Sequence, residues 1–242
     1  MSVREKRGKD ELRPIEFHPG YLIHPQGSCF VKWGNTWVIC SAQVEERVPA
    51  FLQNTHTGWI TAEYSMIPGA TDPRITREQV RMGGRTKEIQ RMIGRSLRGV
   101  TNLEILGERT MHIDCEVIQA DGGTRMASVA GGFIALLEAV SKLKRDRVIT
   151  RSPIREYLGG VSVGKVKGDY LLDLNYEEDS QAEVDMNIVM TESGKFVEIQ
   201  GSAEGCPFSR EEINALLNLA SQGIEEIIRK IKEVTKDIWM GF

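Results

Sequence analysis

The first third of the chain has the apolar pattern of strands, and apolar and polar residues alternate again over residues 111–117. Segments with this alternation, or with the short apolar runs of buried strands, predict β-strands over residues 29–33, 36–44, 59–66 and 111–117. Gly34 and Asn35 separate the first two segments, a two-residue spacing typical of a tight hairpin turn. We therefore expect this part of the chain to be rich in paired strands.

Two later segments have the length and periodicity of helices. Residues 126–143 predict a buried helix, in which the Gly131–Gly132 pair indicates close backbone packing. Ser209 and Glu212 form a capping-box pattern at the start of a C-terminal helix. The apolar stripe of that helix consists of Ile213, Leu216, Leu217, Ala220, Ile224, Ile227, Ile228 and Ile231.

A second β-rich region follows Pro153. The predicted strands cover residues 158–166, 170–175, 183–191 and 196–202. The order of elements is then strands, helix, strand, helix, strands, helix. This order predicts an α+β fold with helices packed on mainly antiparallel or mixed sheets.

Composition changes this picture little. The 242 residues are enough for one substantial core, and no stretch approaches the apolar length needed to span a bilayer. The charged N-terminal segment lacks the apolar core of a secretory signal. The scattered cysteines predict four buried thiols in a reducing cytoplasm rather than a disulfide framework or a zinc site; they are Cys29, Cys40, Cys115 and Cys206.

Charge is distributed unevenly. Residues 74–98 contain eight basic and two acidic residues, a net charge of +6, which leaves −9 for the rest of a chain whose total is −3. A cationic segment on an otherwise acidic protein indicates an anionic partner. The arginines upstream of residue 83, Arg74, Arg77 and Arg81, lie in a stretch containing Gly and Pro that predicts a mobile loop suited to a polyanionic backbone.

The second part of the cationic segment predicts an amphipathic helix. Ile89, Met92, Ile93 and Leu97 recur at helical spacing, and the opposite face carries Arg91, Arg95 and Arg98. Like charges at this spacing repel unless an anion compensates them. The alternative is a solvated face with salt bridges, but no matching acidic residue lies nearby in the sequence. We therefore favour phosphate binding by this face.

The pentapeptide DGGTR precedes the buried helix. Gly122 and Gly123 allow a tight turn, and free N–H groups at a helix N-terminus attract anions. Thr124 adds a hydroxyl donor and Arg125 a planar fork suited to phosphate oxygens. The alternative is a plain loop in which Thr124 caps the helix.

Acidic residues crowd the segment from 173 to 185. Asp185 lies in an apolar strand with Asn187 on the same face, and Asp179 comes from the turn before it. The two carboxylates could converge on Mg²⁺, which prefers one or two carboxylates together with substrate phosphate oxygens and water. Structural roles, a turn cap for Asp179 and an arginine partner for Asp185, remain an equal alternative.

Together, an anion cradle, an arginine-rich surface and a carboxylate pair are the parts needed for transfer at a phosphorus centre. No GxSxG motif is present for a serine nucleophile, and no GxxxxGK[ST] motif for an ATP-binding loop.

Several long motifs in sequence order carry a resemblance to a known family. GWITAEYSMIPGAT, GGRTKEIQRMIGRSLR, LGERTMHIDCEVIQADGGTRMAS and LDLNYEEDSQAEVDMNIVM closely resemble the ribonuclease PH family, and the likeness covers nearly the whole chain. The resemblance implies one ribonuclease PH-type domain over residues 1–242, related to a ribosomal protein domain. It also implies a ring of six subunits arranged as a trimer of dimers.

The reaction implied by the resemblance is phosphorolysis. Inorganic phosphate, the co-substrate, attacks the last phosphodiester of a transfer RNA precursor and releases a nucleoside diphosphate. The family pattern implies phosphate binding by Arg85, Gly123, Thr124 and Arg125. It also implies a metal-binding (Mg²⁺ or Mn²⁺) or acid–base pair at Asp179 and Asp185.

RNA contacts are expected at the cationic segment, through Arg74, Arg77, Arg81, Arg91, Arg95 and Arg98. Two departures from the family pattern lie near the expected site: TDPRITRE in the basic loop and MASVAGG after the GTR motif.

Three other functions are less favoured alternatives to ribonuclease PH. An archaeal-type exosome subunit would need a partner, an inactive ring scaffold would not need both aspartates, and a polynucleotide phosphorylase would need a longer chain.

Overall fold

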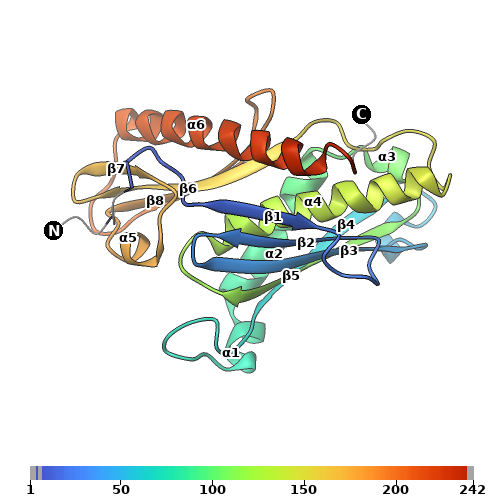
Figure 1. Ribbon diagram of the computed structural model, residues 1–242, viewed down its shortest axis with the longest axis horizontal. Coiled ribbons are helices and arrows are strands. Elements are labelled where there is room, and N and C mark those ends of the chain that lie inside the picture. Colours follow the sequence, from blue (N-terminus) through green and yellow to red (C-terminus); the bar gives the residue numbers. More distant parts are fainter. Residues whose placement is uncertain (1–3, 5–6, 239–242) are drawn as a thin grey trace.

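The computed structural model of the chain describes Arg4 and residues 7–238, apart from the side chains of Arg81 and Met82. It has two sheets, seen side by side along the long axis of the molecule (Figure 1). The strands of the first sheet, in spatial order, are β1 (Ile15–Pro19), β2 (Gly27–Trp33), β3 (Thr36–Glu45), β5 (Thr110–Gln119) and β4 (Trp59–Met66). Only the β4–β5 pair is parallel, so this sheet is mixed.

The second sheet is antiparallel throughout. Its strands, in spatial order, are β7 (Asp169–Leu172), β6 (Leu158–Val166), β8 (Val184–Thr191) and β9 (Phe196–Ala203). The predicted α+β fold with helices on mixed or antiparallel sheets is therefore confirmed.

Three long helices cover the sheets. The helix α4 (Thr124–Arg145) packs on β2 and β3, α2 (Gly84–Gly99) packs on β4, and α6 (Arg210–Thr235) lies along the second sheet and also contacts α4. One hydrophobic cluster joins side chains from both sheets and all three helices, including Ile113, Phe133, Val161, Ile188 and Ile227. The two sheets thus share a continuous core through α4.

The close packing predicted at Gly131 is confirmed. A Cβ atom at this position would lie 2.6 Å from Val31 Cγ2 and 2.7 Å from Cys40 Sγ, closer than van der Waals contact allows. Glycine therefore lets α4 approach the first sheet at this point. The Gly34–Asn35 hairpin turn and the Ser209–Glu212 capping box are also confirmed.

Several short elements were not predicted. They are β1, the 3₁₀ turn Ala50–Leu52, α1 (Arg77–Met82), α3 (Leu103–Leu106) and α5 (Tyr176–Ser180). The stretch expected to be a mobile loop contains α1, because Thr76 and Gln79 form a capping box at its start. The predicted strand 170–175 ends at Leu172, since Asp173 has a positive φ of 55°.

Two expectations from composition were wrong. Cys206 is exposed, while Cys29, Cys40 and Cys115 are buried, and all four are free thiols. Among the described residues α4 is long and apolar enough to cross a membrane, yet 89% of its apolar window is buried inside the protein. The core helix of a globular protein has these same properties.

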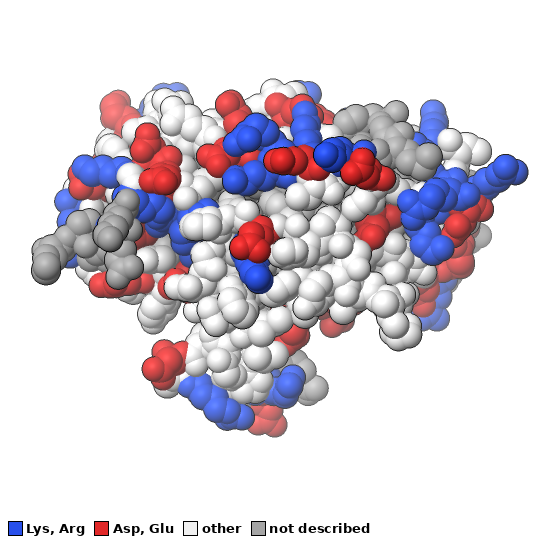
Figure 2. All heavy atoms as spheres, in the orientation of Figure 1, with Lys and Arg blue, Asp and Glu red and all other residues white. Residues whose placement is uncertain are grey.

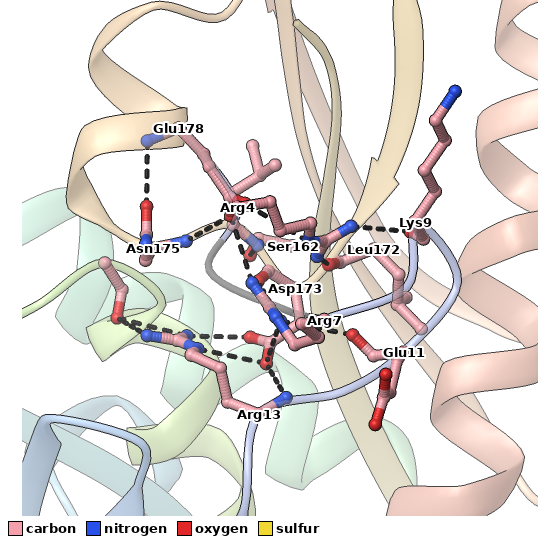
Figure 3. Close-up of polar contacts among 12 residues, drawn as sticks. Arg4, Arg7, Lys9, Glu11, Arg13, Ser162, Leu172, Asp173, Asn175 and Glu178 are labelled. Atoms are coloured by element: carbon pink, nitrogen blue, oxygen red, sulfur yellow. Dashed lines mark hydrogen bonds and ion pairs between the residues drawn. The ribbon is translucent and has the colours of Figure 1, made fainter. Parts of the chain in front are cut away.

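A buried cluster of charged side chains ties the N-terminal segment to the end of β7. Asp173 is 1% exposed, and its carboxylate accepts a hydrogen bond from Arg13 Nη2 at 2.7 Å (Figure 3). It also accepts one from Trp33 Nε1 at 2.9 Å. Burial alone would raise the pKa of Asp173, but the Arg13 guanidinium outweighs this and holds that pKa below its ordinary value. The carboxylate is therefore ionised and joins a strand of the first sheet to the edge of the second.

We expect Asp173→Asn to lower the free energy of unfolding by about 3–5 kcal/mol at neutral pH, because the guanidinium groups lose their buried counter-charge. Since the folded-state pKa of Asp173 lies below its ordinary value, the carboxylate stabilises the fold above the ordinary carboxyl pKa. That stabilisation is lost as the pH falls through the folded-state pKa. Urea unfolding over a pH series should therefore show the difference between wild type and variant shrinking in acid.

The control is Asp169→Asn, which removes the carboxylate of an exposed ion pair with Lys9 at the start of the same strand. This change should have little effect at any pH. A loss of stability as large as that of Asp173→Asn would contradict a special role for the buried cluster.

Candidate active site

A cavity of about 390 Å³ opens where the first turn of α4 meets β8 and α5. Residues from both halves of the chain line it. All six residues predicted for phosphate and metal binding are among them: Arg85, Gly123, Thr124, Arg125, Asp179 and Asp185. The fold thus brings together three motifs that lie up to 100 positions apart in the sequence.

The first turn of α4 has the geometry of an anion cradle. Gly123 is the N-cap residue, with a left-handed φ of 68° and no side-chain cap. Thr124 is therefore the first helical residue and does not cap the helix. The first N–H groups of α4 consequently have no side-chain acceptor and can bind an anion.

The turn before the helix lies directly against the second half of the chain. A Cβ at Gly122 would stand 2.6 Å from Asn175 C and 2.7 Å from Leu174 O, and its φ is 71°. Glycine is required here for both the conformation and the close approach. This contact places the start of α5, and with it Asp179, beside the cradle.

Tyr64 on β4 contacts the cradle through Thr124. It is 3% exposed, and its hydroxyl donates to Thr124 Oγ1 at 2.9 Å. Burial raises the pKa of Tyr64 to about 12, so the phenol stays neutral and keeps its proton. Because Thr124 accepts this bond, its own hydroxyl hydrogen is free to donate into the cavity.

Arg125 and Arg85 supply the positive charge of the cavity. Arg125 Nη2 lies 3.6 Å from Glu88 Oε2, while its Nε is buried and has no hydrogen-bond partner among the described residues. A buried donor without an acceptor is costly, and a bound anion would satisfy it. Arg85, in the first turn of α2, is exposed at the cavity.

The two aspartates face these arginines. Asp179 lies in α5 rather than in the predicted turn, and Asp185 lies on β8, where its Oδ1 accepts from Ser202 Oγ at 2.8 Å. Burial and the neighbouring charge of Asp185 raise the pKa of Asp179, while Arg85 and Arg125 act in the opposite direction. Two positive and two negative groups therefore interact within one cavity.

The carboxylate pair fits a divalent cation of a particular kind. The described residues contain no group of three or more His, Cys, Asp and Glu side chains placed to hold a metal. A site with only two protein carboxylates suits an ion that keeps water and takes its other ligands from substrate, as Mg²⁺ does. Asp179 and Asp185 would then hold the ion at the cavity wall.

Some of the arginines expected to bind RNA are free at the surface, and others have partners within the protein. Arg74, Arg77 and Arg91 are exposed, and the side chain of Arg81 lies outside the described part of the chain. The expectation that α2 lacks acidic partners is wrong for Arg95, whose Nη2 lies 2.6 Å from Glu198 Oε1 on β9. The sequence did not predict this pair, because the two residues are 103 positions apart.

The guanidinium of Arg98 contacts β4 within the protein. Its Nη1 donates to Ile60 O at 2.7 Å, and its guanidinium lies 4.3 Å from the centre of the Trp59 ring. Burial, followed by the charge of Arg95, lowers the pKa of Arg98. These contacts occupy the group that was expected to bind phosphate.

Two further residues of the cavity were not predicted as functional. Asn187 is buried and points the same way along β8 as Asp185, and its side chain makes no hydrogen bond within the described residues. Tyr176 lines the same cavity with 65% of its surface exposed. The alternation of β8 identified the position of Asn187, but no pattern in the sequence indicated the placement of Tyr176.

Comparisons with known proteins identify the family of the chain. Residues 11–141 match domain 1 of the 3′ exoribonuclease family, and residues 156–223 match domain 2. Ribonuclease PH of Bacillus velezensis is 58% identical over 231 residues, which are 94% of each chain. Ribonuclease PH of Bacillus subtilis is 57% identical over 235 residues, 96% of each chain.

Solved structures share the fold at low sequence identity. An Archaeoglobus fulgidus exosome with RNA bound to the active site has a TM-score of 0.77 at 22% identity, covering 94% of this chain and 90% of that one. Rice Rrp46 also has a TM-score of 0.77, at 17% identity, covering 95% and 98%. Both family domains and the full-length likeness to ribonuclease PH show that this chain belongs to the 3′ exoribonuclease family.

Proposed function

We propose that the chain trims the 3′ extensions of transfer RNA precursors, acting as the phosphorolytic 3′–5′ exoribonuclease that its ribonuclease PH relatives indicate. One observation carries the proposal: a single cavity combines an anion cradle with a carboxylate pair. Such a site can hold inorganic phosphate next to a phosphodiester and offset the charge that develops between them.

In the proposed reaction an oxygen of inorganic phosphate attacks the phosphorus of the terminal phosphodiester. The new P–O bond forms a nucleoside 5′-diphosphate, and the bond from phosphorus to the 3′ oxygen of the preceding nucleotide breaks. That oxygen leaves with a proton as the new 3′ hydroxyl. Arg85, Arg125 and Thr124, with the first turn of α4, would orient the attacking phosphate in line with the breaking bond.

The carboxylates complete the site. Asp179 and Asp185 would hold Mg²⁺ or Mn²⁺, which supplies charge neutralisation at the phosphodiester when bound. The hydrogen bond from Ser202 fixes one oxygen of Asp185 and leaves the other directed at the site. Where Asp179 alone holds the ion, this second oxygen of Asp185 is placed to pass the proton that the attacking phosphate gives up to the departing 3′ oxygen.

RNA would approach over the cationic segment. We assign backbone contacts to the arginines of α1 and its preceding loop and to the exposed face of α2: Arg74, Arg77, Arg81 and Arg91. Arg95 can join them by exchanging its surface partner Glu198, whereas the internal contacts of Arg98 argue against a role in binding RNA. A hollow of about 490 Å³ shares Arg125 and Asp185 with the cavity and continues over β9.

We further propose that six copies form a ring. The face over β1–β3 is largely free of charged residues (Figure 2), and the loop after β1 exposes 51% of Tyr21 and 90% of Ile23. An uncharged surface with exposed apolar side chains is typical of an interaction site. Light scattering of the purified chain should give the mass of a homohexamer, and a monomer would contradict the ring.

The free thiols favour the cytoplasm. Cys40 Sγ and Cys115 Sγ lie 3.6 Å apart without a disulfide, and Cys206 is an exposed thiol. Such thiols persist in reducing compartments. Fractionation of cells that express the chain should recover it with cytoplasmic markers; recovery with secreted proteins would contradict this assignment.

The first prediction for this function concerns the products. With Mg²⁺ and a 3′-extended transfer RNA, the purified chain should release nucleoside diphosphates only when inorganic phosphate is present. Thin-layer chromatography separates these from monophosphates. Monophosphates without phosphate would mean hydrolysis, and no products would favour an exosome-type subunit that needs a partner, or an inactive scaffold.

Arg85→Ala should reduce phosphate use most strongly, because Arg85 offers an exposed guanidinium at the cavity. We expect KM for phosphate to rise by about tenfold or more, in line with the loss of a charge-assisted contact. The control is Arg229→Ala on α6, which removes an exposed arginine far along the chain from the cavity lining. An equal rise in the control would show that only overall charge matters.

Asp185→Asn should lower the chemical rate by about a hundredfold or more and leave RNA affinity largely intact. The change keeps the size of the side chain and its place opposite Ser202 but removes the negative charge. Single-turnover kinetics measure the rate, and filter binding measures the affinity. A parallel loss of RNA affinity would contradict the proposed division between binding and chemistry.

A further inference from the structure

We infer that Arg13 is a positioning residue for phosphate, acting through the backbone of the turn at residues 121–123. The inference rests on the proposed function, because the turn opens the cradle assigned to phosphate. Arg13 does not line the cavity. Its effect on phosphate binding would pass through the turn, whose Asp121 carbonyl it binds.

The Arg13 guanidinium contacts two partners at once (Figure 3). Nη2 donates to Asp173 Oδ1 at 2.7 Å and Nε donates to Oδ2 at 3.0 Å, which makes a bidentate pair. Nη1 remains free of that pair and donates to Asp121 O at 2.6 Å. One planar group thus connects the end of β7 to the turn that begins the cradle.

The Arg13 side chain itself is held firmly. It is 8% exposed, and its backbone N–H also donates to Asp173 Oδ2, at 2.8 Å. Asp173 is fixed in turn by Trp33 Nε1 from β2, at 2.9 Å. The donor that reaches Asp121 therefore has a position set by the core of the protein.

The turn depends on such contacts for its orientation. Gly122 and Gly123 both have positive φ, 71° and 68°, and glycine is the residue with the fewest conformational restrictions. Thr36 holds the turn as well, since its Oγ1 donates to Gly122 O at 2.6 Å and accepts from Asp121 N at 3.0 Å; the bonds from Asn35 and Tyr176 to the Asp121 side chain are longer, at 3.3 Å. The N–H groups of α4 follow directly after this turn.

The same cluster reaches the opposite wall of the cavity. Arg7 Nη1 donates to Asp173 O at 2.9 Å, and its Nη2 pairs with Glu178 Oε2 at 3.1 Å. Glu178 is fully buried in α5 and precedes Asp179. The cluster therefore fixes both the phosphate cradle and the helix that carries one carboxylate, and small displacements of such groups are expensive in catalysis.

The test compares Arg13→Lys with Arg109→Lys. Lysine keeps a positive charge beside Asp173 but cannot bond that carboxylate at two points and also reach Asp121 O. Arg109 likewise joins a carboxylate, that of Glu46, to a backbone carbonyl, but its partners lie outside the turn and it does not line the cavity. We expect Arg13→Lys to weaken phosphate binding about tenfold, in Kd by calorimetry and in KM, and Arg109→Lys to leave both within about twofold.

Thr36→Val provides a second variant if Arg13→Lys folds poorly. It keeps the shape of the side chain and removes the hydroxyl that bonds Gly122 O, so phosphate binding should weaken again. Thermal unfolding of each variant identifies the temperature at which all are folded, and binding is compared there.

Unchanged phosphate affinity in folded Arg13→Lys and Thr36→Val would overturn the inference, as would equal weakening in Arg109→Lys. A wild-type chain that degrades RNA without phosphate would instead refute the proposed function. Calorimetry with inorganic phosphate would still decide the role of Arg13 in that case, because its readout needs no RNA and no turnover.

Discussion

The ion pair between Asp173 and Arg13 is the interaction on which the active site depends. A buried carboxylate is tolerated only with strong partners, and Asp173 has two guanidinium groups, an indole N–H and a backbone N–H around it. These partners come from the N-terminal segment and from the first sheet, while Asp173 itself ends β7 in the second. The pair therefore fixes how the two halves meet. The phosphate cradle and the carboxylate pair belong to different halves, and this junction, together with the shared core and the close contact at Gly122, makes them face each other.

In the cavity too, guanidinium groups balance carboxylates. Arg85 and Arg125 oppose Asp179 and Asp185, so the formal charges of the cavity lining balance, and the cavity can accept both a phosphate and a divalent cation. Neutral donors supply the remaining specificity. The phenol of Tyr64 keeps its proton because it is buried, and its bond to Thr124 turns that hydroxyl toward an anion. The fold thus provides donors at fixed positions before any substrate binds, which is the condition for strong electrostatic stabilisation.

Local patterns predicted the parts of the site that depend on neighbours in sequence. The turn at Gly122–Gly123 followed by a helix, the apolar face of α2 and the alternation that places Asp185 with Asn187 were all recognisable, and the family resemblance assigned roles to them. Contacts between distant segments were not predictable in this way. Glu198 pairs with Arg95 across 103 positions, and Arg13 reaches Asp121 across 108. Asp173 was counted with the acidic segment, but no pattern marked it as the residue that ends β7 at a positive φ and binds Arg13.

The location of phosphate tests this account most directly. We would titrate inorganic phosphate into the chain without RNA and follow backbone amides by NMR after selective isotope labelling. The account predicts saturable shifts at Thr124 and Arg125, in the first turn of α4, and none at Arg210 and Glu211, in the capped first turn of α6. Saturable shifts at α6 with none at α4 would contradict the central claim that α4 and its arginines form the phosphate site.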